Sequence, residues 1–188
     1  MKRYLILVKH SLPEIVKNVS AHKWKLSDEG RVRAQRLAER LSLYQPEVIV
    51  SSIEPKAKET AEIIAKKHGL KLHIVEGLHE HDRSKTPYLS KDEFKAAIRE
   101  FFEKPDALVF GSETADQTHT RFDQTVRSVL NYYGDKTVAI VAHGTVISLF
   151  VSRLTGISDL ILWNELGLPS FIVIDVQSAA LVNKENIL

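Results

Sequence analysis

Short apolar runs alternate along this chain with longer stretches in which apolar residues recur at helical spacing. Residues 4–8 form the first run, and residues 48–50 and 137–142 form two similar ones. Unbroken runs bounded by polar residues are typical of strands that are covered on both faces of a sheet. Residues 170–176 predict a further strand, and residues 179–183 predict an edge strand.

Five stretches between these runs predict helices. Ser27 and Ser90 are typical N-cap residues, the second in a capping box with Glu93, and Pro55 suits the first turn of a helix. In four stretches, apolar residues recur three or four positions apart, as the buried face of a helix requires. These residues are Ala34, Leu37, Ala38 and Leu41; Ala57, Ala61, Ile64 and Ala65; Phe94, Ile98, Phe101 and Phe102; and Phe122, Val126, Val129 and Tyr133. The fifth stretch, residues 145–154, is apolar nearly all round and predicts a buried helix.

The alternation of strand and helix determines the expected fold class. A strand, a helix and a further parallel strand are joined by a crossover connection, which places helices on the faces of the sheet. We therefore expect one α/β domain over residues 1–188, a three-layer α/β/α sandwich with a mostly parallel central sheet. Residues 76–89 and 104–113 are polar and weakly periodic. Long loops of this kind are often functional, so both are predicted to be lid segments, although plain surface connections fit each of them equally well.

Composition excludes several classes of protein. The 188 residues are 44% hydrophobic and 27% charged, which suits a globule that buries a core. Lysine and arginine number 26 against 24 acidic residues, a net charge of +2, which argues against a nucleic-acid partner bound through a broad basic field. The absence of cysteine excludes disulfides, thiol catalysis and cysteine-ligated metals.

The hydrophobic runs are too short for targeting or membrane insertion. The N-terminal run ends at Val8, earlier than in a signal peptide. His143 and Gly144 interrupt the most apolar stretch, so no run approaches the roughly 18 residues of a spanning helix. The sequence therefore predicts a cytoplasmic protein without a membrane partner.

Two histidines stand in matching contexts. His10 stands just beyond the first predicted strand. His143 stands just beyond a late strand, at the start of a helix. Because ligands bind outside the carboxyl ends of parallel strands, both imidazoles are expected in one crevice. Lys9 adjoins His10, and Lys56 lies in the first turn of the helix after SSIEP. Two cations and a helix N-terminus beside two imidazoles predict a site for an anion, especially a phosphoryl group. Any one of these residues alone fits a structural or solvated role.

Six segments within residues 4–154 carry a resemblance to a known family. They are Lys9-His10-Ser11, WKLSDEGRVRAQRLA, SSIEPKAKETAEIIA, Leu78-His79-Glu80, residues 111–121 and VAHGTVIS. In this order they resemble the motifs of the histidine phosphatase superfamily, the phosphoglycerate-mutase-like group. The first stands where that family has an Arg-His-Gly tripeptide, and the last fits its second-histidine motif.

The resemblance implies a metal-independent phosphomonoesterase that needs no cofactor. His10 would attack phosphorus and form a phosphohistidine, which water then hydrolyses. His143 would donate a hydrogen bond to the phosphoryl oxygens. Glu80 would protonate the leaving alkoxide and afterwards deprotonate the water. Asp82 and Glu113 are the alternatives to Glu80 in this role.

The resemblance also implies a phosphate site built from Lys9, Lys56, His143 and Gly144. The helix that Gly144 opens would direct its amide N–H groups at the anion. Both arginines that the family places around the phosphate are lysines here, so the charge is kept while the bidentate fork is lost. A weak or inactive protein that binds phosphorylated ligands is therefore one alternative, and a phosphoglycerate mutase is another. The expected partner is a small phosphate ester or a phosphorylated protein.

The segment around Glu80 allows further hypotheses. His79 and His81 share a face of an extended chain and could bind one metal ion, but no third ligand stands at a diagnostic spacing, so no metal site is predicted. Arg83, Lys85 and His22 could contact the rest of a substrate or could simply be solvated.

Overall fold

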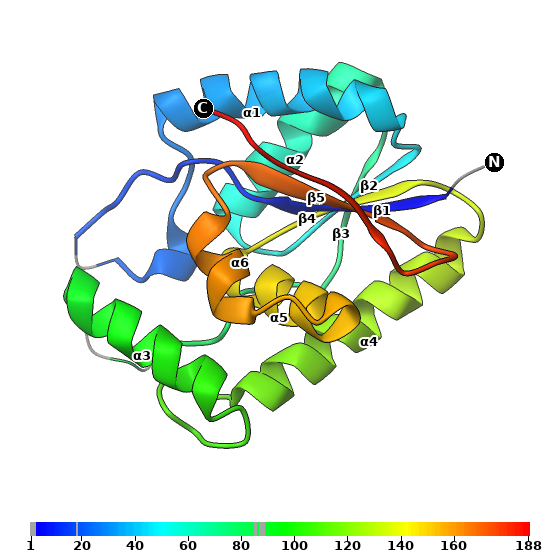
Figure 1. The fold of residues 1–188 in the computed structure, drawn as a ribbon. Coiled ribbons are helices and arrows are strands. Elements are labelled where there is room, and N and C mark those ends of the chain that lie inside the picture. The colour runs from blue at the N-terminus through cyan, green and yellow to red at the C-terminus, as the bar shows by residue number, and fades with distance from the viewer. Residues whose placement is uncertain (1–2, 18, 85, 87–88) are drawn as a thin grey trace.

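One mixed sheet of six strands runs through the chain in the order β3-β2-β4-β1-β5-β6 (Figure 1). The computed structural model describes residues 3–188 apart from residues 18, 85 and 87–88. Strands β3, β2, β4 and β1 pair in parallel, whereas β5 is antiparallel to β1 and β6 to β5. The strands are β1 (Tyr4–Lys9), β2 (Val48–Ser51), β3 (Leu72–Ile74), β4 (Val138–Ala142), β5 (Ser170–Asp175) and β6 (Leu181–Asn186).

Helices cover both faces of this sheet (Figure 1). On one face lie α1 (Asp28–Leu41) and α2 (Pro55–His68). The other face is covered by α4 (Ala115–Tyr133), α5 (Gly144–Thr155) and α6 (Asp159–Glu165). Helix α3 (Lys91–Glu103) packs outside this layer against α5 and α6. Two short 3-10 helices, Ala21–Lys23 and Ser42–Tyr44, lie in the connections. The predicted α/β sandwich with a mostly parallel sheet is confirmed.

The central strand β1 shows why its apolar run is unbroken. Successive side chains of a strand point to opposite faces, and here both faces are covered. Leu5 and Leu7 pack with α4 and α5, whereas Ile6 and Val8 pack with α1 and α2. All four side chains are buried. This double burial fixes the register of β1 and the position of the residues that follow it.

Helix caps follow the sequence closely. The Ser27 hydroxyl accepts a hydrogen bond from the Gly30 amide, which begins α1. Ser90 and Glu93 form the predicted capping box at the start of α3. Thr114 caps α4 with Gln117 in the same way.

Three differences from the predicted elements lie at the periphery. Strand β3 and helix α6 were not expected, because three and seven residues are too few to display a period. The predicted edge strand is present but begins two residues later, at Leu181, since Ala179 adopts a positive φ of 55° in the turn after β5.

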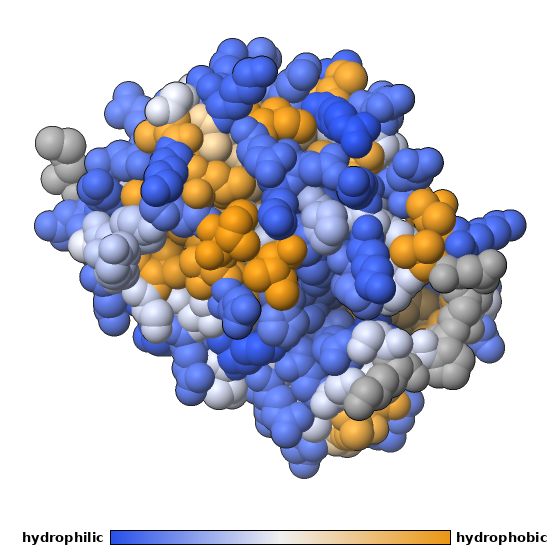
Figure 2. Space-filling model, turned by 180° about the vertical axis from the view of Figure 1, so that it is seen from behind, coloured by the Kyte–Doolittle hydropathy of each residue, from blue (hydrophilic) through white to orange (hydrophobic). Residues whose placement is uncertain are grey.

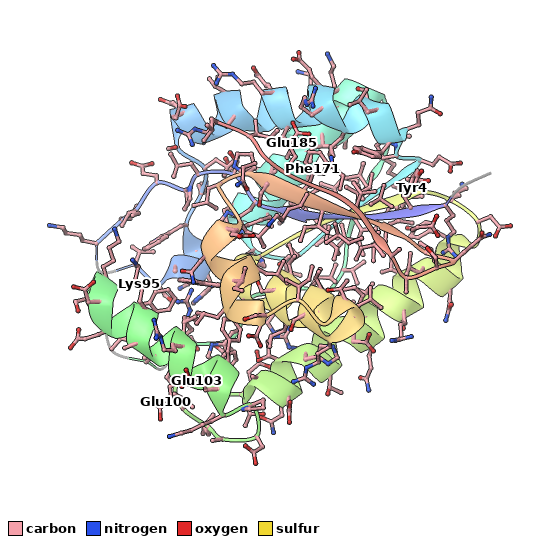
Figure 3. The ribbon with its side chains drawn as sticks, viewed as in Figure 1. Tyr4, Lys95, Glu100, Glu103, Phe171 and Glu185 are labelled. Atoms are coloured by element: carbon pink, nitrogen blue, oxygen red, sulfur yellow. The ribbon has the colours of Figure 1, made fainter. Side chains whose placement is uncertain are left out.

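The outer surface is largely polar. Lys95, Glu100 and Glu103 project from the exposed side of α3 (Figure 3). From behind, hydrophobic side chains gather in a patch on an otherwise mostly hydrophilic face (Figure 2). Among the described residues, no helix combines the length and the apolar character needed to cross a membrane.

Candidate active site

The carboxyl ends of three neighbouring parallel strands bring the two histidines together. His10 follows β1 and His143 follows β4. The His10 amide donates to the Ala142 carbonyl at 3.0 Å, and the Ser52 amide after β2 donates to the Val141 carbonyl at 2.9 Å, so the three strand ends are aligned. The imidazole centroids lie 5.2 Å apart with an interplanar angle of 62°. The two imidazoles therefore meet at this edge of the sheet.

His10 is held in one tautomer. The residue is only 7% exposed, and Nδ1 lies 2.7 Å from the carbonyl oxygen of Ser11. A carbonyl can only accept, so Nδ1 carries the proton and Nε2 keeps its lone pair. Burial, with the charges of His143 and Lys56, holds the pKa of His10 well below its ordinary value. The imidazole is thus uncharged at neutral pH.

His143 is completely buried beside the end of β2. Its Nε2 lies 2.8 Å from the Ser52 hydroxyl and 3.4 Å from Oε1 of Glu54. Burial, followed by the Lys56 charge, lowers the pKa of His143 well below its ordinary value. Nδ1 has no hydrogen-bond partner among the described residues.

Lys56 is committed to a buried ion pair. The residue is 5% exposed, and its Nζ lies 2.5 Å from Oε2 of Glu54. The same ammonium also donates to the Ala21 carbonyl at 2.7 Å. Much of its charge is therefore balanced inside the protein.

Glu54 is a site residue that the sequence analysis missed. It is 6% exposed, and besides the contact with Lys56 its Oε1 accepts the Glu80 amide at 2.9 Å. Glu54 thereby ties the start of α2 to the segment that carries Glu80. Its sequence signal is a carboxylate between Ser52 and Pro55, at the carboxyl end of a strand, where the analysis considered only a helix start.

Lys9 lies across the start of α5. Its Nζ donates to the Leu166 carbonyl at 2.7 Å. Burial, only partly offset by Glu80, lowers the pKa of Lys9 to about 8. A Cβ on Gly144 would stand 3.1 Å from Cε of Lys9, so the bare glycine backbone makes room for the lysine.

The Glu80 carboxylate caps helix α5. It accepts the amides of Thr145 at 3.1 Å and Val146 at 3.3 Å, and also the His81 amide at 3.0 Å. Burial raises the pKa of Glu80, but nearby positive charge and these amides outweigh it and lower the pKa overall. The helix amides expected to face a bound anion are thus in part engaged by a carboxylate of the protein itself.

Arg121 anchors this segment and engages one alternative to Glu80. It donates to the carbonyls of Gly77 at 2.8 Å and His79 at 2.9 Å, and it pairs with Glu113 at 2.5 Å. The other alternative, Asp82, accepts the Ser84 amide. Within the described part of the chain, neither Glu113 nor Asp82 makes a hydrogen bond or ion pair with His10 or His143.

The remaining polar candidates lie around this centre. The His81 ring is part of an aromatic cluster. Its centroid lies 4.4 Å from that of Phe101 and 4.7 Å from that of Phe110. Among the described residues, no group of three His, Cys, Asp or Glu side chains is arranged to hold a metal ion. His22 is exposed and contacts Ser20, and Lys85 lies outside the described residues.

A buried neutral imidazole, a second imidazole beside it and a surrounding set of ammonium and carboxylate groups define a site for acid–base and anion chemistry. The model of the histidine phosphatase superfamily (branch 1) matches residues 5–182. The chain therefore belongs to this superfamily. A comparison with curated proteins finds no significant match.

Solved structures share the fold at low sequence identity. Phosphoserine phosphatase from Entamoeba histolytica, in complex with 3-phosphoglyceric acid, is 20% identical with a TM-score of 0.80, over 98% of this chain and 97% of that one. Mycobacterial glucosyl-3-phosphoglycerate phosphatase is 23% identical with a TM-score of 0.74, over 92% and 90%. The alpha-ribazole phosphatase from Shigella flexneri is 18% identical with a TM-score of 0.72, over 98% and 95%.

Proposed function

We propose that the protein is a metal-independent phosphomonoesterase that works through a phosphohistidine on His10. The observation that carries this proposal is the state of the His10 ring. The Ser11 carbonyl holds the proton on Nδ1, and the lowered pKa keeps the ring uncharged, so Nε2 has a free lone pair. An uncharged, oriented imidazole is a nucleophile that needs no further activation.

In the first step the Nε2 lone pair attacks phosphorus. The N–P bond forms while the bond from phosphorus to the alcohol oxygen breaks, and that oxygen takes a proton from the Glu80 carboxyl group. Negative charge on the equatorial oxygens is stabilised by the Lys9 ammonium and by His143. Lys56 and Gly144 complete the phosphate site.

In this mechanism the bound substrate supplies the proton that Glu80 needs. In the free protein the pKa of Glu80 is lowered, so the group is a carboxylate. Phosphate monoesters have a second pKa near 6, so part of the substrate arrives with a proton. The negative charge of the bound phosphoryl group raises the pKa of the neighbouring carboxyl and favours transfer of that proton to it.

In the second step water attacks the phosphohistidine. Glu80, now ionised, accepts a proton from the water as the oxygen bonds to phosphorus and the N–P bond breaks. Inorganic phosphate leaves, and the His10 ring recovers its lone pair. Glu80 is again protonated and returns this proton to the solvent or to the departing phosphate.

The substrate in this proposal is a small phosphate ester or a phosphorylated protein. Two of the structural neighbours are a phosphoserine phosphatase and a glucosyl-3-phosphoglycerate phosphatase, which supports the small-ester class. The proposal keeps residues 76–89 and 104–113 as lid segments over the site, of which residues 85 and 87–88 lie outside the described part of the chain. The Ser112 amide donates to the Asp82 carbonyl at 2.8 Å, which joins the two segments. The proposal keeps the predicted cytoplasmic location and requires no nucleic acid.

Hydrolysis of p-nitrophenyl phosphate in the presence of a chelator tests this function. His10→Ala is expected to lower kcat by about 10³-fold or more, because it removes the nucleophile. The matched control is His68→Ala, which removes an imidazole from the last turn of α2, at the end of the helix far from Lys56, and leaves kcat unchanged. Equal rates for the wild type and His10→Ala, or complete loss of activity with the chelator, would overturn the proposal.

A protein that binds phosphorylated ligands without turnover is the second candidate. The Lys56–Glu54 pair favours it, since this internal pairing weakens the field available to a phosphoryl group. It predicts saturable vanadate binding with no release of phosphate, and formation of a phosphoenzyme on His10 would exclude it. For the alternative phosphoglycerate mutase, release of inorganic phosphate without isomerised product would count against it.

A further inference from the structure

The segment that leads to Arg83 is held by contacts with other parts of the chain. The preceding His81 ring packs in the aromatic cluster with Phe101 and Phe110. The Asp82 amide donates to the Glu113 carboxylate at 3.1 Å, and the Asp82 carbonyl accepts the Ser112 amide. The segment that carries Arg83 is therefore positioned by tertiary contacts before any ligand binds.

The guanidinium of Arg83 is supported on one face and unpaired at its edges. Its Cζ lies 4.4 Å from the centroid of the Phe94 ring, which is a cation–π contact. The Phe94 ring in turn meets Trp163, with centroids 5.9 Å apart. Among the residues that the structure describes, no hydrogen bond or ion pair engages the five N–H donors of Arg83. A half-buried guanidinium in this state is set to receive an anion.

The charge of Arg83 acts on the centre of the site. It contributes to lowering the pKa of Glu80 and of His143, each of which responds first to burial. Burial lowers the pKa of Arg83 itself, and the carboxylates of Glu80 and Glu54 oppose this. The guanidinium therefore shares the electrostatic environment of the groups that surround the proposed phosphoryl position.

The two lysines are less free to bind a phosphoryl group. The Lys56 ammonium is engaged by Glu54 and by a backbone carbonyl. The Lys9 ammonium donates to Leu166, and its pKa of about 8 leaves it partly uncharged in mildly alkaline solution. A guanidinium stays charged at every working pH and presents two parallel donors to two oxygens.

We propose that Arg83 grips two equatorial oxygens of the transferring phosphoryl group and supplies the bidentate contact that neither lysine makes. This assignment rests on the proposed function and names the group that orients the phosphoryl oxygens for in-line attack by His10. Arg83 acts on the phosphoryl group itself, so its contribution is the same whichever alcohol the ester carries.

Kinetics of Arg83→Gln and Arg83→Lys on two esters, p-nitrophenyl phosphate and an aliphatic phosphate monoester, test the assignment. For both esters, Arg83→Gln is expected to lower kcat/KM by about 100-fold, the usual cost of removing a donor to transition-state charge. Arg83→Lys keeps a charge without the fork and is expected to recover about tenfold of this loss. The matched control, Arg99→Gln, removes an exposed guanidinium from the outer side of α3 and leaves the kinetics unchanged.

Three kinetic outcomes would overturn the assignment. A loss confined to one ester would show that Arg83 contacts the alcohol part, full activity of Arg83→Lys would show that a point charge suffices, and full activity of Arg83→Gln would remove Arg83 from the site. The affinity for vanadate, measured by calorimetry, distinguishes failure of the Arg83 assignment from failure of the proposed function. If the wild type binds vanadate without turnover, phosphatase activity fails, yet a tenfold weaker binding by Arg83→Gln still supports the contact. Unchanged vanadate binding refutes it.

Discussion

Two sides of the candidate site are built in different ways. The strand side consists of the ends of β1, β4 and β2, where buried apolar strands fix the positions of His10 and His143. The loop side, which carries Glu80 and Arg83, has no regular secondary structure and is held by the Arg121 guanidinium, by the buried Leu78 and by the packing of His81 on Phe101.

On one side the hydrophobic core fixes the positions of the residues, whereas on the other they depend largely on a few polar contacts. On the first side, strand register is set by many buried side chains, so no single surface contact is essential to it. On the second, the guanidinium of Arg121 bonds to three backbone carbonyls and one carboxylate, beside the apolar contacts of Leu78 and His81. The loop side should therefore be much more sensitive to single polar substitutions.

The largest effect is expected from Arg121→Ala. The change leaves the Gly77 and His79 carbonyls and the Glu113 carboxylate without their partner, which should lower the free energy of unfolding by roughly 2–4 kcal/mol. Urea denaturation measures this. The control on the same helix is Arg127→Ala, whose pair with Asp123 is exposed, and its expected change is under about 0.5 kcal/mol. Equal effects of the two changes would contradict the comparison.

A pH series on Lys9 addresses the strand side. Because the pKa of Lys9 is about 8, its ammonium loses its charge above that pH, and phosphate or vanadate affinity should fall by up to about tenfold per pH unit. Lys9→Arg stays charged, so its affinity should lack this decline. A decline of the same size in both proteins would assign it to another group.

Stability should move in the opposite direction over the same pH range. The unfolded chain keeps its proton on Lys9 up to an ordinary lysine pKa of about 10.4, whereas the folded chain releases it near 8. Between these values the unfolded state binds more protons, so the Lys9 contribution to the free energy of unfolding rises with pH. Comparison with Lys9→Met at pH 8 and pH 10 isolates this contribution.

The smallest effect is expected from Gly144→Ala. The new Cβ would stand 3.1 Å from Cε and 3.3 Å from Nζ of Lys9, the far end of a flexible chain that can shift. Phosphate affinity should fall by a few-fold, since a small displacement of a charge changes its interaction modestly. In the Lys9→Met background the effect should vanish, which a double-mutant cycle checks.

Much of the fold could be predicted from the sequence. The strands β1, β2, β4 and β5 and the helices α1 to α5 have clear apolar periods or caps, because their buried faces depend on many residues. Short elements carry too little pattern. Residues Leu72–Ile74 and Asp159–Glu165 adopt their structure through packing against longer elements, which a local pattern cannot display.

The site could be predicted only in part. His10, His143, Lys9 and Lys56 follow from strand ends and neighbouring residues, and the structure brings them together. The partnership of Glu54 with Lys56 and of Arg121 with Glu113 could not be predicted. Those bonds depend on how side chains of separate loops meet, and nothing in the spacing of the residues encodes it.

In the proposed reaction, the bonds of Glu80 to the first turn of α5 connect proton transfer to helix stability. A proton on either carboxylate oxygen weakens it as an acceptor for the Thr145 or Val146 amide. Each catalytic cycle would then briefly loosen and restore the beginning of a helix whose body lies in the hydrophobic core. Amide exchange at these two positions would consequently report the ionisation of one carboxyl group, from the protein interior, without any chromogenic substrate.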